Sequence, residues 1–223
     1  MPIMSKLNSL HSRLYAAAKY FLAPIIYRQP PIGLEPSELG IYLHELLNRA
    51  SVPGDIAEIG CHMGGTACVA SALVKKYTPH KSYTCFDTFD GFVESQLKAD
   101  LDRGTPTSVQ MRFANNSLAL VRRILDLHGC NEVHLVKGDI ATVPNESFSD
   151  RYSVILLDVD LAEPTYVGLK RLYPRLSEGG IILIDDCRQD PGQIWKAMLG
   201  YQRFCKENDL APRIHYGFGI IEK

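Results

Sequence analysis

The sequence predicts an α/β protein built on a mostly parallel β-sheet with helices on both faces. Three observations support this prediction. Apolar runs of strand length alternate with helical stretches, these runs are apolar throughout rather than at every second position, and glycine or aspartate follows several of them directly. Strands that are apolar on both sides are typical of parallel sheets, because the connecting helices cover both faces.

Five runs have the length and composition of buried strands, and helical stretches separate them. The strand-like runs are residues 55–60, 82–88, 133–139, 152–160 and 179–187. The helical stretches are residues 66–77, 117–128, 165–176 and 193–208. The tail, residues 212–223, favours two short strands added at one edge in antiparallel orientation, so the sheet is predicted to have seven strands.

Two helices are predicted before the first strand. Residues 5–22 have apolar side chains at helical spacing, and the following prolines, of which Pro24 is the first, should end that helix and begin a linker. Residues 35–50 form the second helix. We therefore divide the chain into a helical arm with its linker, residues 1–34, and one larger domain, residues 35–223.

The segment 88–116 shows no clear periodicity. Long patternless segments inside such folds are often functional loops. We expect this one to order over a bound substrate as a lid.

Charge and composition exclude some classes of partner. A formal net charge of −1 over 223 residues provides no basic field for nucleic acid or anionic lipid. The six cysteines show no CxxC spacing, so we expect reduced thiols in a cytoplasmic protein. The apolar arm, residues 5–27, is expected to cover the core or a second subunit of a homo-oligomer. Association of that arm with a membrane surface is the less favoured alternative.

A glycine-rich stretch, DIAEIGCHMGGTA, follows the first predicted strand and precedes a helix. Glycines at this place allow the backbone to turn tightly and to approach a ligand closely. The carboxylate of Glu58 would repel a phosphate, but it suits a cationic ligand such as S-adenosylmethionine. The expected cofactor contacts here are Glu58, Gly60, His62, Gly64, Gly65 and Thr66. For His62, fixing the loop backbone is an equal alternative.

Acidic residues end three of the following strands. Asp87 ends the second, where a carboxylate can accept both ribose hydroxyls of a cofactor. The sequences LLDVD and LIDDC end the fourth and fifth and place four carboxylates at one sheet edge: Asp158, Asp160, Asp185 and Asp186. Grouped carboxylates repel one another unless a cation joins them. Oxygen ligands favour Mg²⁺, with Mn²⁺ or Ca²⁺ as substitutes.

These motifs resemble the macrocin O-methyltransferase (TylF-type) family. The segments PGDIAEIGCHMGG and LYPRLSEGGIILIDDC carry the likeness, which runs from about residue 35 to the C-terminus. The resemblance implies a Rossmann-like class I methyltransferase fold, S-adenosylmethionine as cofactor and a sugar hydroxyl as acceptor. It implies Asp158, Asp185 and Asp186 as Mg²⁺ ligands and Asp160 as general base. It also implies cofactor contacts from Glu58, Gly60, Asp87, Asp139 and Ile140.

Two alternatives differ from this hypothesis in function. A catechol-type phenol O-methyltransferase would share the fold, but such enzymes usually carry a lysine shortly after the first metal aspartate. Here Leu161 and Ala162 follow Asp160, and Ala162 also replaces a tyrosine that is common in the sugar-modifying enzymes. A non-catalytic cofactor-binding scaffold is the second alternative, and the complete set of carboxylates argues against it.

Overall fold

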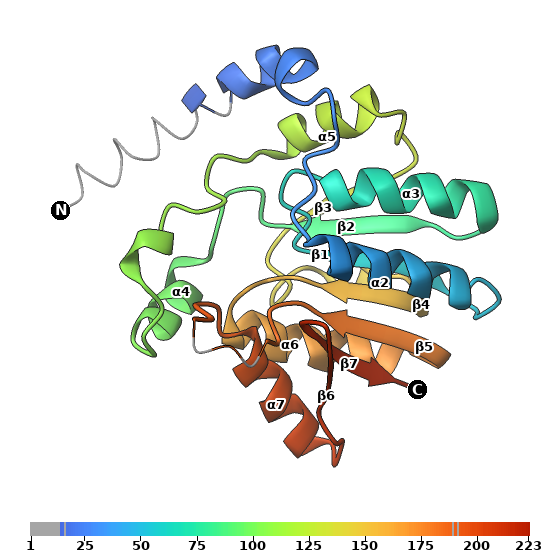
Figure 1. Ribbon diagram of the computed structural model, residues 1–223, viewed down its shortest axis with the longest axis vertical. Helices are drawn as coiled ribbons and strands as arrows, with labels where there is room; N and C mark the ends of the chain where they lie inside the picture. Colours follow the sequence, from blue (N-terminus) through green and yellow to red (C-terminus); the bar gives the residue numbers. More distant parts are fainter. Residues whose placement is uncertain (1–13, 16, 189, 191) are drawn as a thin grey trace.

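In the computed structural model, which describes residues 14, 15, 17–188, 190 and 192–223, the described residues form one seven-stranded sheet between two layers of helices (Figure 1). The strand order is β3-β2-β1-β4-β5-β7-β6. The chain therefore builds outward from β1 in one direction and then, from β4 on, in the other. This reversal beside β1 creates the switch point at which α/β sheets bind ligands.

β1 to β5 pair in parallel, and β7 pairs in antiparallel orientation with both β5 and β6, so the predicted mostly parallel sheet is confirmed. The parallel strands are β1 (Asp55–Ile59), β2 (Tyr83–Asp87), β3 (His134–Lys137), β4 (Tyr152–Leu157) and β5 (Leu176–Ile184). The two C-terminal strands are β6 (Arg213–His215) and β7 (Phe218–Glu222). β4 is buried along its whole length, as expected for a central parallel strand.

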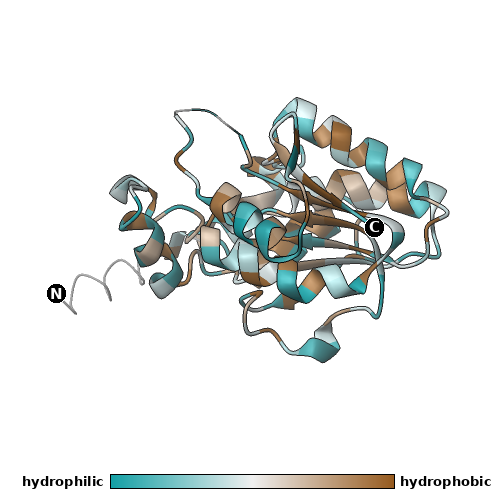
Figure 2. Cartoon of the chain, turned by 90° about the horizontal axis from the view of Figure 1, so that it is seen from below, coloured by the Kyte–Doolittle hydropathy of each residue, from teal (hydrophilic) through white to brown (hydrophobic). Residues whose placement is uncertain are grey.

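The helices bury the sheet from both sides, and Figure 2 shows the apolar strands between them. One core cluster joins the sheet to α2 (Pro36–Asn48), α3 (Gly65–Tyr77) and α5 (Leu118–Leu127). The other joins the opposite face to α6 (Ala162–Leu172) and α7 (Ala197–Glu207). Side-chain hydrogen bonds to backbone N–H groups cap the N-termini of two of these helices, α2 and α5. Glu38 accepts a hydrogen bond from the Glu35 N–H (3.1 Å), and Ser117 accepts one from the Leu120 N–H (3.2 Å).

The segment 88–116 is more ordered than predicted, because it contains α4 (Glu94–Leu101) and a 3₁₀ turn (Thr107–Val109). α4 buries only Leu97 and Asp100, so no apolar periodicity marks it in the sequence. The fully buried Asp100 carboxylate accepts a hydrogen bond from the Ala162 N–H (2.8 Å) and thereby fastens α4 to the start of α6. Whether the segment moves as a lid stays a prediction.

The N-terminal arm packs on the domain. Its described helix, residues 17–26, runs through Pro24, so the predicted end at Pro24 is wrong. A proline removes one helical hydrogen bond, and burial of Ala23 and Tyr27 against the core keeps this helix in place. Residues 5–13 of the predicted helix lie outside the described residues. None of the described helices combines the length and apolar composition needed to cross a bilayer.

Candidate active site

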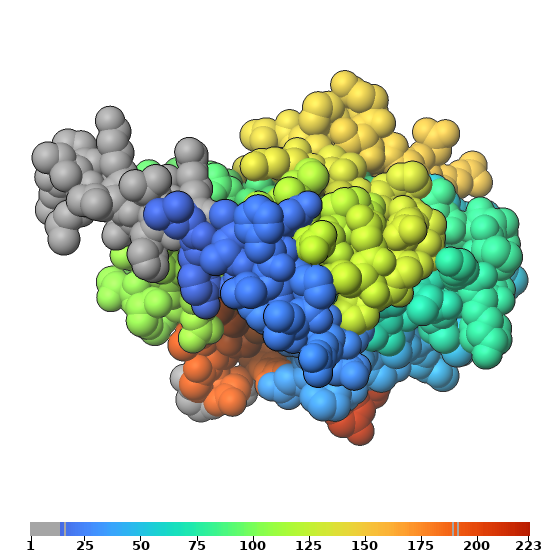
Figure 3. All heavy atoms as spheres, turned by 90° about the horizontal axis from the view of Figure 1, so that it is seen from above, coloured from blue at the N-terminus to red at the C-terminus, as the bar shows by residue number. Residues whose placement is uncertain are grey.

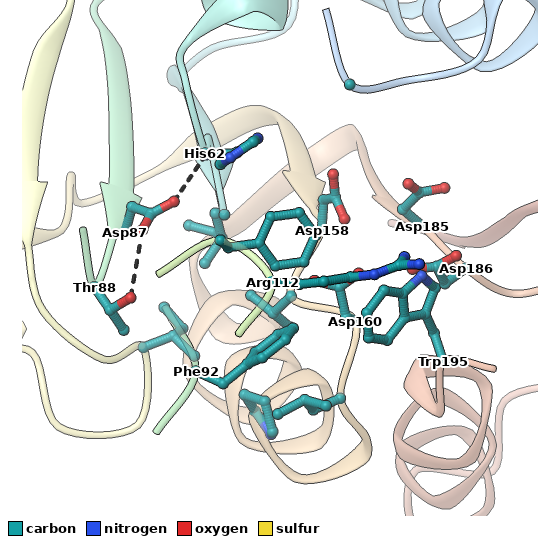
Figure 4. A pocket seen from close by; sticks show the side chains of 18 of the residues that line it. His62, Asp87, Thr88, Phe92, Arg112, Asp158, Asp160, Asp185, Asp186 and Trp195 are labelled. Carbon is teal, nitrogen blue, oxygen red and sulfur yellow. Dashed lines mark hydrogen bonds between the residues drawn. The ribbon is translucent and has the colours of Figure 1, made fainter. Parts of the chain in front are cut away.

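A cavity of about 490 Å³ lies beside the carboxyl ends of the parallel strands (Figure 4). One half is lined by residues that follow β1, β2 and β3, including Gly60, Asp87 and Asp139. The other half is lined by the aspartates that follow β4 and β5. The cavity thus joins the two groups of residues that the sequence marks most clearly.

Gly60 determines how closely the ends of β1 and β4 approach. Its φ is +90°, and a Cβ atom built on it would lie 1.7 Å from the backbone oxygen of Asp158. The Asp158 N–H in turn donates to the Ile59 carbonyl at 2.8 Å. Only glycine fits this close approach of the two strands, which brings the loop after Gly60 next to the aspartates.

The carboxylate of Asp87 organises the loop that follows Gly60. It accepts hydrogen bonds from the N–H groups of His62 (2.8 Å) and Phe89 (2.7 Å). The amide of Asn116 donates to the His62 carbonyl at 2.6 Å. Burial, and then the charge of Lys19, lowers the pKa of His62 to about 4, so its ring is neutral at physiological pH. His62 and Asp87 both line the cavity, and their backbone contacts explain how the loop keeps its shape.

Glu58 lies elsewhere than expected, because it does not line the cavity. Its buried carboxylate accepts a hydrogen bond from the Tyr83 hydroxyl, and that hydroxyl lies 2.9 Å from the hydroxyl of Tyr42 on α2. Strand alternation directs Glu58 to the same side as Ile56, toward α2. Burial raises the pKa of Glu58 to about 7. In this structure Glu58 therefore has a role within the core, and its expected contact with the cofactor stays a prediction.

Gly64, Gly65 and Thr66 also lie outside the cavity lining, against expectation. A Cβ atom built on Gly65 would lie 2.2 Å from the backbone of Pro31, so the linker lies directly on this glycine. Thr66 is buried behind it. The linker itself contributes Gly33 to the cavity wall, so the predicted domain boundary at residues 34–35 passes through the site.

Asp139 and Ile140 line the cavity where the sequence places them. The Asp139 carboxylate accepts hydrogen bonds from the side chain of Gln96 (2.8 Å) and from the Ala141 N–H (3.0 Å). Gln96 belongs to α4. The patternless segment is thus connected to the half of the cavity that is lined by residues from the ends of β1, β2 and β3.

All four predicted aspartates line the other half of the cavity. Asp158, Asp160 and Asp186 each place an atom able to bind a metal within 4.8 Å of the other two, and Asp185 lies outside that group. Asp160 does not reach the site by strand alternation, because β4 ends at Leu157 and Asp160 has a left-handed φ of +60°. Its carbonyl accepts hydrogen bonds from the N–H groups of Lys196 (2.9 Å) and Ala197 (3.0 Å) at the start of α7.

Burial and like charge raise the pKa of Asp158, Asp160 and Asp185, and the nearby guanidinium groups of Arg112 and Arg188 oppose these shifts only in part. Burial raises the pKa of Asp158 and Asp160 well above the ordinary range, and the neighbouring aspartates add to both shifts. The same causes raise the pKa of Asp185 to about 8, while burial raises that of Asp186 to about 6. Within the described part of the chain, no lysine or arginine forms an ion pair with any of the four. This donor set fits a hard divalent cation.

An aromatic wall, which sequence reasoning did not identify, faces the carboxylates. It consists of Phe92, Phe113 and Trp195, whose ring centroids lie 5.3 to 6.1 Å apart. The Arg112 guanidinium lies 5.3 Å from the centre of the Trp195 ring, and both side chains lie beside Asp160 and Asp186 in Figure 4. Arg112 and Phe113 belong to the patternless segment and Trp195 to the loop after β5. No local signal marks them, because only the fold brings them together.

A second missed contribution comes from α2. Glu38 is buried, lines the cavity and forms an ion pair with Arg188 (2.5 Å), which also contacts Glu35 (2.9 Å). The charge of Glu38 contributes to the raised pKa of Asp185. The first turn of α2 therefore forms one side of the carboxylate half.

Comparison with known families identifies the relatives of this chain. Residues 42–214 match the family described as macrocin-O-methyltransferase (TylF). This chain belongs to the TylF family. The match extends from α2 to β6 and includes both halves of the cavity, so the resemblance of the glycine and aspartate motifs to that family is confirmed.

Two relatives of this TylF-family chain are named as O-methyltransferases. It is 29% identical over 163 residues to the 8-demethyl-8-(2,3-dimethoxy-alpha-L-rhamnosyl)-tetracenomycin-C 4'-O-methyltransferase of Streptomyces olivaceus, covering 70% of this chain and 61% of that protein. It is 31% identical over 148 residues to the mycinamicin III 3''-O-methyltransferase of Micromonospora griseorubida, covering 62% and 57%. The matches span only 57% to 61% of the length of these relatives.

Solved structures confirm the predicted class I methyltransferase fold of this TylF-family chain. The calicheamicin methyltransferase CalS11 superposes with a TM-score of 0.67 at 22% identity, over 96% of this chain and 91% of that chain. The O-methyltransferase NovP superposes with a TM-score of 0.64 at 19% identity, over 97% and 99%. At these identities the likeness concerns the fold alone.

The metal-free TylF-family protein should lose stability as the pH rises from about 4 to about 8. Unfolded aspartates titrate near pH 3.9, whereas burial and like charge raise the folded pKa of Asp185 to about 8 and burial raises that of Asp186 to about 6. Within this range the folded state binds more protons than the unfolded state, so raising the pH favours unfolding. Urea unfolding in EDTA should give a lower midpoint at pH 8 than at pH 5.

Two comparisons test the cause of this pH dependence. Asp185→Asn should have a shallower dependence, since one of the titrating groups is gone. Mg²⁺ at pH 8 should restore much of the lost stability of the wild type, because a ligand that binds only the folded state stabilises it. Equal or higher midpoints at pH 8 in EDTA would contradict the prediction.

Proposed function

We propose that this protein transfers a methyl group from S-adenosylmethionine to a sugar hydroxyl of a small-molecule natural product, and that this reaction requires Mg²⁺. One observation carries the proposal: a single cavity joins a glycine turn and the Asp87 carboxylate to a close group of half-buried aspartates. Membership of the TylF family supports it. The name of the Streptomyces relative, which includes a rhamnosyl group, supports a sugar acceptor.

The cofactor half is suited to a nucleoside with a cationic tail. Gly60 lines the cavity, and its left-handed φ of +90° forms the turn after β1, where the backbone of related folds approaches a ligand. Asp87 ends β2, where a carboxylate accepts ribose hydroxyls in related folds. Asp139 and Ile140 would complete this half on the side of β3. The neutral ring of His62 avoids repulsion of a sulfonium.

Asp158, Asp185 and Asp186 would hold the Mg²⁺. Asp158 and Asp186 belong to the group whose candidate ligand atoms lie within 4.8 Å. Asp185 is the neighbouring carboxylate whose charge raises the pKa of Asp158 most strongly after burial. A divalent cation bound there would lower the pKa of an acceptor hydroxyl and orient it.

Asp160 would accept the proton of the acceptor hydroxyl. It lies in the same group, and the N–H groups at the start of α7 hold its backbone in place. A general base must lie within hydrogen-bond reach of the proton that it removes. Its position beside Asp186 and Trp195 places it between the carboxylates and the aromatic wall (Figure 4).

The aromatic wall would bind the sugar ring. Carbohydrate rings present apolar C–H faces and polar edges, and pockets that combine aromatic side chains with a few charged groups match both. Trp195 and Phe92 offer the apolar surface, while Arg112 and Asp160 offer polar groups at its edge. Alignment of the acceptor hydroxyl with the methyl donor would supply much of the rate.

The first test is calorimetric titration with S-adenosylmethionine in Mg²⁺ and in EDTA, followed by a mass-spectrometric methylation assay. The acceptors would be rhamnosylated natural products, with catechol as the phenol alternative. We expect cofactor binding in both buffers and Mg²⁺-dependent methylation of a rhamnosyl acceptor. Absence of cofactor binding in both buffers would refute the proposal, and methylation of catechol alone would favour the phenol alternative.

Asp160→Asn should retain metal binding and lose turnover, whereas Asp185→Asn should lose metal affinity. General-base catalysis contributes about 10²- to 10⁴-fold to a rate, so kcat of Asp160→Asn should fall by that factor. Mn²⁺ binding measured by electron paramagnetic resonance separates the two variants. If Asp160→Asn loses Mn²⁺ and Asp185→Asn keeps it, the ligand set is Asp158, Asp160 and Asp186 instead.

A further inference from the structure

The outward side of the N-terminal arm is an exposed apolar face. Phe21 exposes 76% of its surface and Ile25 65%, while Ala23 and Tyr27 are buried against the domain. The other strongly exposed apolar residues of the described arm are Leu14, Tyr15, Leu22 and Ile26. An ordinary surface helix turns its polar side to water, so this arrangement marks a contact surface.

The arm has little support of its own. Its continuously described helix covers only residues 17–26, and isolated helices shorter than about 12–15 residues are marginal in water. Its contacts with the domain include the buried side chains of Ala23 and Tyr27 and the approach of the His128 ring to the Tyr27 carbonyl (3.1 Å). A further apolar contact on the opposite side would stabilise it.

A groove lies beside this face. It separates the arm from α5, has a volume of about 380 Å³ and is lined by Tyr20, Leu118, Leu127 and charged side chains of α5. Figure 3 shows the arm and α5 next to one another on this surface. Phe21, next to Tyr20, has the most exposed side chain of the arm, so a projection and a hollow stand side by side.

We propose that this face binds the same face of a second copy of the chain. A two-fold interface needs one surface that carries both a projection and its complementary hollow, and here the exposed Phe21 lies beside the α5 groove. The exposed parts of these six arm residues with Leu118 and Leu127 amount to roughly 800 Å², if a fully exposed side chain of this size contributes about 190 Å². A stable interface buries about 800 Å² per partner.

The charges around the groove also favour a second copy over an anionic membrane. Arg122 forms an ion pair with Asp126 (3.0 Å), and the Arg123 guanidinium lies 4.8 Å from the centre of the Tyr20 ring. Both signs of charge therefore border the groove, and the chain carries a net charge of −1. A two-fold arrangement can place Arg122 of one copy near Asp126 of the other, whereas a bilayer rich in phosphatidylserine would repel Asp126.

The test is sedimentation velocity of the full chain over a concentration series, with the double variant Phe21→Asp/Ile25→Asp. Both positions are exposed, so the variant should fold, which circular dichroism checks. Tyr77→Asp is the control, because Tyr77 exposes 53% of its surface at the end of α3 away from the linker. We expect dimers for the wild type and the control, and a dissociation constant raised at least tenfold in the double variant.

The proposal would be wrong if the wild type stayed monomeric at every concentration. It would also be wrong if the folded double variant dimerised as tightly as the wild type. Monomers that co-sediment with phosphatidylserine vesicles would assign the face to a membrane instead. If the double variant fails to fold, the amide hydrogen exchange of the wild type, measured at several protein concentrations, tests the dimer instead. Protection of residues 17–26 must then rise with protein concentration, and constant protection overturns the proposal.

Discussion

Replacing Asp158 by asparagine should abolish Mg²⁺-dependent methyl transfer and at the same time stabilise the metal-free protein. A bound cation supplies several kcal/mol of charge stabilisation in such reactions, so kcat/KM should fall by about 10³-fold or more. Asp158 is one of the three aspartates grouped within 4.8 Å, and burial and its neighbours raise its pKa well above the ordinary range. The charge is thus unfavourable in the empty protein.

Asparagine keeps the shape of the side chain and removes this charge. Thermal unfolding in EDTA should therefore show a higher Tm for Asp158→Asn than for the wild type, by about 2–4 °C for each kcal/mol gained. Addition of Mg²⁺ should raise the Tm of the wild type only. Asp150→Asn is the control, since Asp150 is exposed and outside this cavity. A variant that loses activity and also loses stability in EDTA would show that Asp158 supports the fold rather than a cation.

Gly60→Ala should strongly destabilise the protein. The new Cβ atom would lie 1.7 Å from the Asp158 carbonyl oxygen, and the hydrogen bond from the Asp158 N–H to the Ile59 carbonyl (2.8 Å) holds this residue beside β1. Left-handed backbone adds about 1–2 kcal/mol of strain for a residue with a side chain. The strands β1 and β4 would have to separate, so we expect a total loss of about 4 kcal/mol in urea unfolding.

Gly104→Ala separates these two causes. Gly104 has a similar φ of +96°, but nothing lies within 4 Å of a Cβ atom built on it. Its alanine variant should therefore show the conformational strain alone, about 1–2 kcal/mol. If both variants lose the same free energy of unfolding, the close approach of β1 and β4 at Gly60 does not exclude a side chain there.

Much of the fold followed from local sequence patterns. Continuous apolar runs identified β1 to β5, because a strand covered on both faces has no polar side. Boundaries were less accurate, since turn geometry and hydrogen bonds rather than apolar pattern end an element. β4 stops at Leu157, although the apolar pattern continues to Val159. α4 escaped prediction because a buried aspartate, Asp100, holds it in place instead of an apolar stripe.

The candidate site divides in the same way. Convergence of Asp158, Asp160, Asp185 and Asp186 was predictable, because parallel strands bring their carboxyl ends to one edge. The direction of a side chain near a strand end was not. Glu58 points toward Tyr83 and α2, and Gly65 touches the linker at Pro31. Asp160 reaches the aspartate group through a left-handed backbone conformation that strand periodicity does not describe.

The sequence by itself therefore determined the class of fold, the sheet edge that carries the site and the family of the chain, since these depend on residue type and order. Only the tertiary structure decided which residues share the cavity. Arg112, Trp195 and Glu38 come from the patternless segment, from the loop after β5 and from α2, and they meet through packing between remote elements. Contacts of this kind depend on chain direction and helix placement, which no local pattern encodes.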